Sequence, residues 1–159
     1  MGFCEAWPWR EREFFDGVPA TRWKGKLMIV GKKILLVDDD DDLRSLTRTV
    51  LTNEGYSVVE AGNCTLAFDL LRSQQFALVL LDITLPDGNG LRVAEFIREN
   101  KLDCKVIVVT GTTGLANALK GISIGIRDYI AKPFTLEYLM RSIEHVLSTE
   151  ATSQGSRDL

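Results

Sequence analysis

Several residue types that mark common protein classes are scarce in this sequence. Its 159 residues include three cysteines, four prolines and one histidine. The cysteines, Cys4, Cys64 and Cys104, are odd in number and too widely spaced for a disulfide framework or a CxxC metal or redox motif. There is no run of 18 apolar residues and no signal-peptide pattern. We therefore expect a cytoplasmic protein that does not enter a membrane.

Two further absences exclude other functions. The sequence has neither GxxxxGK[ST] nor GxGxxG, which argues against a nucleotide-binding protein. The net charge is −3, but residues 1–33 carry seven basic and four acidic residues, so the remainder has a net charge of −6. DNA binding depends on neutralising phosphates, and an acidic domain does this poorly. We expect no direct contact with nucleic acid.

Residues 1–30 form an extension whose composition differs from the rest. All three tryptophans and three of the seven phenylalanines lie within residues 1–27, interleaved with charges and without a helical or strand period. We expect this extension to be poorly ordered, and translation from Met28 would leave most of it out of the protein. The alternative is an aromatic and basic arm that docks on a partner.

After residue 30, apolar runs alternate with amphipathic segments. Short apolar runs predict strands at 33–37, 56–61, 77–81, 106–109 and 129–131. Apolar residues spaced by three and four predict helices at about 40–53, 63–75, 90–99, 115–122 and 135–148. This alternation predicts an α/β domain with a doubly wound parallel sheet over residues 31–148. The polar tail, residues 149–159, is expected to be disordered.

Four of the five predicted strands end in residues suited to chemistry: Asp38 and Asp39, Asp82, Thr110, and Lys132. Right-handed crossovers place all these strand ends at one edge of a parallel sheet. Carboxylates held close together need a compensating cation, which Lys132 offers, and an oxygen-lined acidic pocket suits Mg²⁺. A carboxylate in such surroundings can attack phosphorus to form an aspartyl phosphate, while a threonine hydroxyl can hydrogen-bond a phosphoryl oxygen.

Four motifs carry a resemblance to a known family. They are LLVDD, VLLDITLPDGNGL, VIVVTG and DYIAKPF, in this order between residues 33 and 148. With these motifs the chain resembles a receiver domain of bacterial two-component response regulators. The resemblance implies a flavodoxin-like fold, a five-stranded parallel sheet with the strand order 2-1-3-4-5.

The resemblance also implies a metal-dependent phosphoacceptor site. Asp82 would be the phosphoacceptor and one of the ligands of Mg²⁺. Asp39 would bind the ion directly, whereas Asp38 would act mainly through water in the metal shell. The backbone carbonyl of Thr84 would complete the protein ligands.

The last two motifs imply a switch. Thr110 would hydrogen-bond the phosphoryl group, and Lys132 would pair with it, next to a Lys132–Pro133 peptide bond that the family uses in the cis form. Tyr129 occupies the family's aromatic switch position, where burial of the ring is coupled to the Thr110 hydroxyl. The alternative is a strand tyrosine with a solvated hydroxyl. Gly111 departs from the family, which often has alanine there.

We therefore expect a stand-alone response regulator that is activated by phosphorylation in a two-component phosphorelay. The donor would be a phosphohistidine of a sensor histidine kinase or a histidine phosphotransfer protein. The signal would pass by protein contact through a face formed by the fourth helix, the fifth strand and the fifth helix. The chain would not be a turnover enzyme, because its chemistry would be limited to self-catalysed phosphoryl acceptance and autodephosphorylation.

Three alternatives remain open at this point. The chain could shuttle a phosphoryl group onward to a phosphotransfer protein. It could be a phosphatase with an aspartyl nucleophile, although Asp82-Ile83-Thr84 lacks the second aspartate of the DxD motif in haloacid-dehalogenase-type enzymes. It could also be a receiver-like interaction module without phosphorylation, which the intact key positions disfavour.

Overall fold

The computed structural model describes residues 13–15, 18–23, 26–29, 31–111 and 125–153. Within them lie a five-stranded sheet with its helices and two small sheets. The helix predicted at 115–122 lies outside the described residues.

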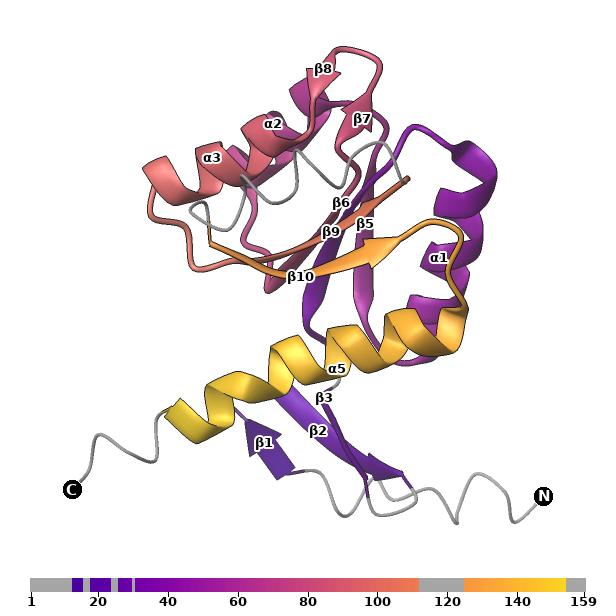
Figure 1. Ribbon diagram of the computed structural model, residues 1–159. Helices are drawn as coiled ribbons and strands as arrows, with labels where there is room; N and C mark the ends of the chain where they lie inside the picture. Colours follow the sequence, from indigo (N-terminus) through magenta and orange to yellow (C-terminus); the bar gives the residue numbers. More distant parts are fainter. Residues whose placement is uncertain (1–12, 16–17, 24–25, 30, 112–124, 154–159) are drawn as a thin grey trace.

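The central sheet is parallel and contains the five predicted strands. These are β4 (Lys33–Val37), β5 (Ser57–Ala61), β6 (Leu78–Leu81), β9 (Lys105–Thr110) and β10 (Ile126–Ala131). Their spatial order is β10-β9-β6-β4-β5 (Figure 1). When these five strands are numbered 1 to 5 along the chain and the sheet is read from β5, the order is 2-1-3-4-5, so the predicted strand order is confirmed. The register pairs Val37 with Leu81, and Thr110 with Ala131, so the strand ends lie along one edge.

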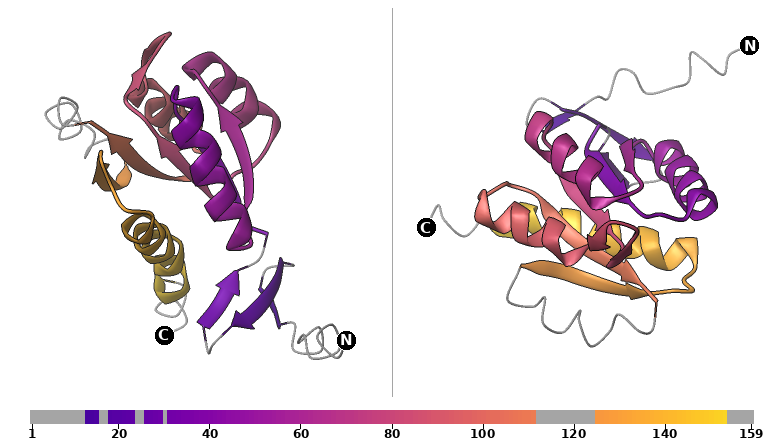
Figure 2. Two further views of the ribbon diagram at one scale, coloured as in Figure 1. Left: turned by 90° about the vertical axis from the view of Figure 1, so that its right-hand side faces the viewer. Right: turned by 90° about the horizontal axis from the view of Figure 1, so that it is seen from above.

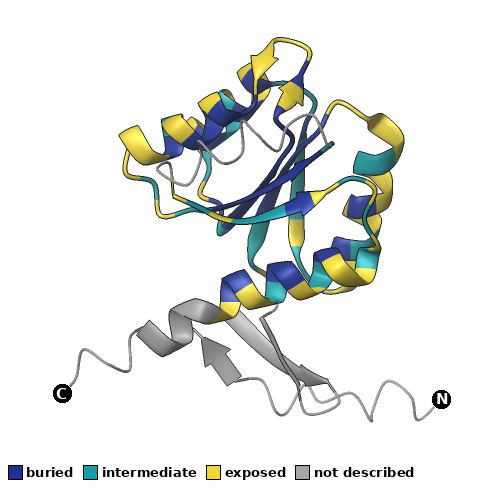
Figure 3. Ribbon diagram, in the orientation of Figure 1, coloured by how far each residue is buried: buried dark blue, intermediate teal, exposed yellow. Residues whose placement is uncertain are grey.

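Helices cover both faces of this sheet. α1 (Asp41–Asn53) and α5 (Leu136–Ser153) lie on one face, while α2 (Cys64–Ser73) and α3 (Leu91–Glu99) lie on the other (Figures 1 and 2). Because side chains alternate along a strand, each strand supplies both cores. Leu35 packs towards α2 and α3, for example, whereas Leu36 packs towards α1 and α5. The central strands are therefore buried on both faces, as Figure 3 shows, which explains their continuous apolar runs.

Local signals set the ends of α1. The Asp40 side chain accepts hydrogen bonds from the amides of Asp42 and Leu43, both at 3.1 Å, and so caps the helix. At the other end Gly55 has a φ of 97°, a conformation that glycine adopts without steric cost. Leu46 of α1 is 51% exposed, so the buried face of this helix is narrower than the spacing of its apolar residues indicates.

Three features differ from the sequence prediction, two of them after residue 30 and one in the N-terminal extension. The turn before α3 contains a small hairpin of β7 (Thr84–Leu85) and β8 (Gly88–Asn89). α5 continues to Ser153, five residues into the segment predicted to be a disordered tail.

In the N-terminal extension, where the sequence shows no strand period, three strands form an antiparallel sheet in the order β1-β2-β3. They are β1 (Glu13–Phe15), β2 (Val18–Trp23) and β3 (Lys26–Ile29). Among the described helices, none has the length and apolar character needed to cross a membrane.

Candidate functional site

The structure brings the predicted strand-end residues together at one edge of the sheet. Asp38 and Asp39 directly follow β4, Asp82 follows β6, and Lys132 follows β10. Carboxylate oxygens of the three aspartates lie within 4.8 Å of one another. Asp38 and Asp82 are buried, with 5% and 6% of their surface exposed, whereas Asp39 is exposed. The site thus has two enclosed carboxylates and one that faces solvent.

Lys132 links the two buried carboxylates. Its Nζ donates to Asp38 Oδ2 at 2.8 Å and to Asp82 Oδ2 at 2.9 Å. Burial by itself lowers the pKa of Lys132, but the hydrogen bonds and negative charges of the two aspartates outweigh it and raise the pKa above its usual value. The ammonium form is therefore stabilised, and it offsets part of the repulsion between the carboxylates.

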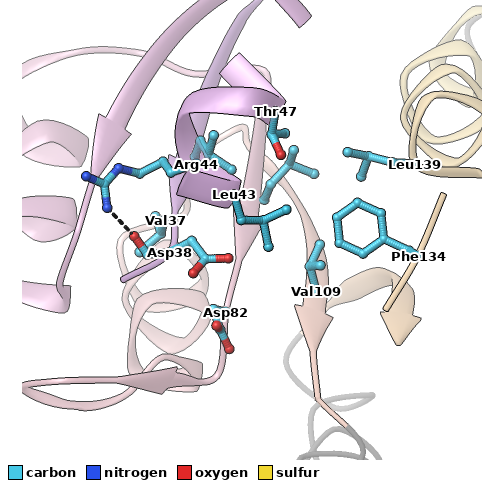
Figure 4. A pocket seen from close by; sticks show the side chains of 11 residues that line it. Val37, Asp38, Leu43, Arg44, Thr47, Asp82, Val109, Phe134 and Leu139 are labelled. Atoms are coloured by element: carbon cyan, nitrogen blue, oxygen red, sulfur yellow. Dashed lines mark hydrogen bonds between the residues drawn. The ribbon is translucent and has the colours of Figure 1, made fainter. Parts of the chain in front are cut away.

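Backbone contacts fix the loop that follows β4. Asp38 Oδ1 accepts a hydrogen bond from the Asp40 amide at 2.9 Å. Arg44, from the first turns of α1, donates through Nη1 to the backbone carbonyl of Asp38 at 2.6 Å (Figure 4). Arg44 also pairs with Asp41 and Glu60. Together with the hydrogen bond from Lys132 to Oδ2, the bond from the Asp40 amide to Oδ1 gives both oxygens of the Asp38 carboxylate a partner within the protein.

Apolar side chains wall the inner side of these carboxylates. Leu43, Val109, Phe134 and Leu139 line a cavity next to Asp38 and Asp82 (Figure 4). The cavity measures about 10 Å³, room for roughly one water molecule and no more. A substrate must therefore approach from the open edge of the sheet, and the apolar wall lowers the local dielectric constant behind the charges.

The segment after Asp82 is held against it. The amide of Thr84 donates to Asp82 Oδ1 at 3.0 Å. Further on, the chain passes so close that a Cβ on Gly90 would lie 1.9 Å from the backbone carbonyl oxygen of Asp82. The φ of Gly90 is −59°, which any residue adopts, so the requirement for glycine here is steric. The sequence predicts Gly90 as the first residue of a helix, but nothing in it indicates this contact.

Thr110 and Tyr129 occupy the predicted positions on neighbouring strands. Thr110 is 4% exposed, and its hydroxyl has no hydrogen-bond partner among the described residues. Tyr129 is half-buried, packs against the core on the α2 and α3 face, and has a pKa raised by burial. The Lys132–Pro133 peptide bond is cis, as the resemblance implied. The coupling between Thr110 and Tyr129 remains a prediction.

The donor set fits a divalent magnesium ion. Mg²⁺ prefers oxygen ligands and binds through few carboxylates while it keeps several waters. Three carboxylates and one ammonium group give the cluster a formal net charge of −2, which one divalent cation balances. The exposed Asp39 leaves the cluster open to solvent, as a partly hydrated ion requires.

Comparisons with known proteins agree with this geometry. The profile of the response regulator receiver domain matches residues 34–144, and the chain belongs to this family. The transcriptional regulatory protein SrrA of Staphylococcus aureus is 33% identical over 125 residues, which is 78% of this chain and 52% of SrrA. The chain therefore spans about half the length of the curated relatives it matches.

Solved structures with the same fold include two receiver proteins. The CheY-like response regulator receiver domain protein from Methanospirillum hungatei JF-1 is 32% identical, with a TM-score of 0.73 over 77% of this chain and 98% of that one. The response regulator TrrA from Thermotoga maritima, solved in complex with Mg(2+)-BeF, is 33% identical, with a TM-score of 0.65 over 72% and 98% of the two chains. The predicted family and fold are confirmed.

The close approach at Gly90 predicts a steric requirement. We expect Gly90→Ala to destabilise the protein by about 2 kcal/mol, because the backbone carbonyl of Asp82 must move to admit the methyl group. A Cβ on Gly111 meets no atom within 4 Å in the described part of the chain, so Gly111→Ala should change stability by less than about 0.5 kcal/mol. Urea denaturation measures both, and equal midpoints for the two variants would contradict the steric explanation.

The bridge formed by Lys132 predicts a metal-dependent stability. We expect Lys132→Met to destabilise the metal-free protein by about 2 kcal/mol, because two buried carboxylates lose their shared cation. Mg²⁺ should then raise the melting temperature of this variant more than that of the wild type. The matched control is Arg141→Met, which breaks an exposed pair with Glu137 and should cost less than about 1 kcal/mol. Equal losses in the two variants would show that Lys132 does not hold the carboxylates together.

Proposed function

We propose that this receiver domain accepts a phosphoryl group on Asp82 from a phosphohistidine in a two-component phosphorelay. The donor would be a sensor histidine kinase or a histidine phosphotransfer protein. The observation that carries the proposal is the pair of hydrogen bonds from Lys132 to Asp38 and Asp82, with Asp39 beside them. A buried carboxylate next to a lysine and a metal-binding cluster is the arrangement that aspartyl phosphate formation needs.

In the reaction, a carboxylate oxygen of Asp82 attacks phosphorus while the phosphorus–nitrogen bond of the phosphohistidine breaks. The bonding electrons leave with the imidazole of the donor. Mg²⁺, held by Asp38, Asp39, Asp82 and the backbone carbonyl of Thr84, would supply positive charge next to the phosphoryl oxygens. The open side of the cluster leaves space for the donor, since the inner side is closed by apolar side chains.

Two residues of this chain are proposed to bind the transferred group. Formation of the acyl phosphate removes the carboxylate charge from Asp82, so Lys132 can exchange that partner for a phosphoryl oxygen. The buried Thr110 hydroxyl can donate to a second oxygen, which would satisfy a group that has no partner among the described residues.

The new Thr110 contact is proposed to act as the switch. The phosphoryl group shifts a conformational equilibrium only if it stabilises one state more than the other. A hydrogen bond from Thr110 to the phosphoryl group would form only in the phosphorylated state, and the half-buried ring of Tyr129 lies on the adjacent strand. The two residues together would convert phosphorylation into a change of surface.

The output is proposed to be a contact with another protein or domain. The face would include β10 and α5, together with a fourth helix whose predicted position lies outside the described residues. Direct nucleic-acid binding by the domain is disfavoured by the net charge of −6 over residues 34–159. In this proposal the chain catalyses only its own phosphorylation and dephosphorylation and does not turn over a separate substrate.

A small-molecule phosphodonor tests this function without knowledge of the kinase. With acetyl phosphate and Mg²⁺, intact mass spectrometry should show one added phosphoryl group, and a chelator should prevent its addition. Asp82→Asn should abolish labelling. Asp69→Asn, which changes an exposed aspartate on α2, should leave the rate unchanged. Labelling of the Asp82→Asn variant at the wild-type rate would refute the assignment, and steady release of phosphate from a generic phosphomonoester would favour a phosphatase.

A further inference from the structure

Asp87 connects the segment after the proposed phosphoacceptor to a distant helix. It lies in the turn of the β7–β8 hairpin, and both of its carboxylate oxygens bind the start of α2. Oδ1 accepts from the Cys64 amide at 2.8 Å, and Oδ2 accepts from the Thr65 amide at 2.9 Å and from Thr65 Oγ1 at 2.8 Å. Three hydrogen bonds thus join residues more than 20 positions apart in the sequence.

The helix has a cap of its own, so its formation does not require Asp87. Asn63 is the N-cap of α2, and its side-chain oxygen accepts from the Leu66 amide at 2.8 Å. A local cap of this kind is the usual way in which a helix start is satisfied. The additional carboxylate therefore ties the hairpin to the helix as well as capping it.

The strength of this tie follows from its charge. The backbone amides of Cys64 and Thr65 stabilise the carboxylate and lower the pKa of Asp87 to about 2. The positive end of the helix dipole acts in the same direction. Asp87 is therefore ionised at neutral pH, and its hydrogen bonds are charge-assisted.

On its other side the hairpin leads directly to Asp82. Thr84 in β7 pairs with Asn89 in β8, and the Thr84 amide donates to Asp82 Oδ1. Gly90 follows β8 and lies against the backbone carbonyl of Asp82. A displacement of the hairpin would therefore move the backbone of Thr84 relative to the Asp82 carboxylate.

We propose that Asp87 is a positioning residue that anchors the β7–β8 hairpin on α2 and so holds the Thr84 backbone and the Asp82 carboxylate in place for Mg²⁺. This inference rests on the proposed function of the site. Groups that orient metal ligands from outside typically change metal affinity 10- to 100-fold when they are removed. Since Asp87 acts through a short hairpin, we expect an effect near the lower end of this range.

The test compares two variants that each remove one cap from the same helix. Asp87→Ala should raise the dissociation constant of Mg²⁺ about tenfold, measured by isothermal titration calorimetry on the full chain. Asn63→Ala removes the local cap but leaves the hairpin anchored, so it should change the dissociation constant by less than about twofold. In the metal-free proteins, hydrogen exchange at the Thr84 amide should accelerate in Asp87→Ala and not in Asn63→Ala.

A milder variant keeps the test valid if Asp87→Ala does not fold. Asp87→Asn retains one side-chain oxygen, so it should weaken Mg²⁺ binding less than alanine does and also speed exchange at Thr84. Wild-type affinity in a folded Asp87 variant would overturn the positioning role alone, as would equal losses in the Asp87 and Asn63 variants. A wild-type protein that neither binds Mg²⁺ nor accepts a phosphoryl group would instead overturn the proposed function.

Discussion

The site depends on one lysine that bridges carboxylates following two other strands. Lys132 follows β10, which is separated from β6 by one strand and from β4 by two. With neighbouring strands about 4.8 Å apart, its ammonium group lies beyond the adjacent strand β9, within hydrogen-bond distance of Asp82 and Asp38. The arrangement therefore requires the observed strand order, in which β9, ending at Thr110, lies between β10 and the two strands that precede the aspartates.

The balance of charge explains why such a cluster suits a switch. Two carboxylates enclosed beside apolar side chains repel each other, and a single ammonium compensates them incompletely. In the proposed function, a divalent cation and a phosphoryl group would both change this charge balance. The interactions broken and formed would connect β4, β6, β9 and β10, so a local change of charge would act on several elements of the fold.

The sequence predicts the central sheet and the strand-end residues well, because both depend on strong local signals. Each strand is a short apolar run, and parallel topology forces the residues that follow the strands to one edge. The contacts of Asp87, Arg44 and Gly90 could not be predicted in this way. Asp87 joins an exposed turn to the start of a helix, Arg44 joins a helix to the backbone of a loop, and Gly90 lies against a backbone carbonyl. The periodic spacing of apolar residues gives no sign of such contacts. The sequence does not predict that α5 continues to Ser153. Glu150 and Ala151 favour helices, but they lie among polar residues that are typical of a disordered tail.

The most direct test of the account is a titration of the metal-free protein with Mg²⁺, followed by the chemical shifts of the backbone amides. If the strand ends form one metal site, the shifts should move together, with a single dissociation constant, at Asp39, Thr84 and Lys132. The exposed acidic residues Asp69 and Glu137 should not respond in this concentration range. Shifts confined to the acidic run at 40–42, or spread evenly over exposed carboxylates, would contradict the account.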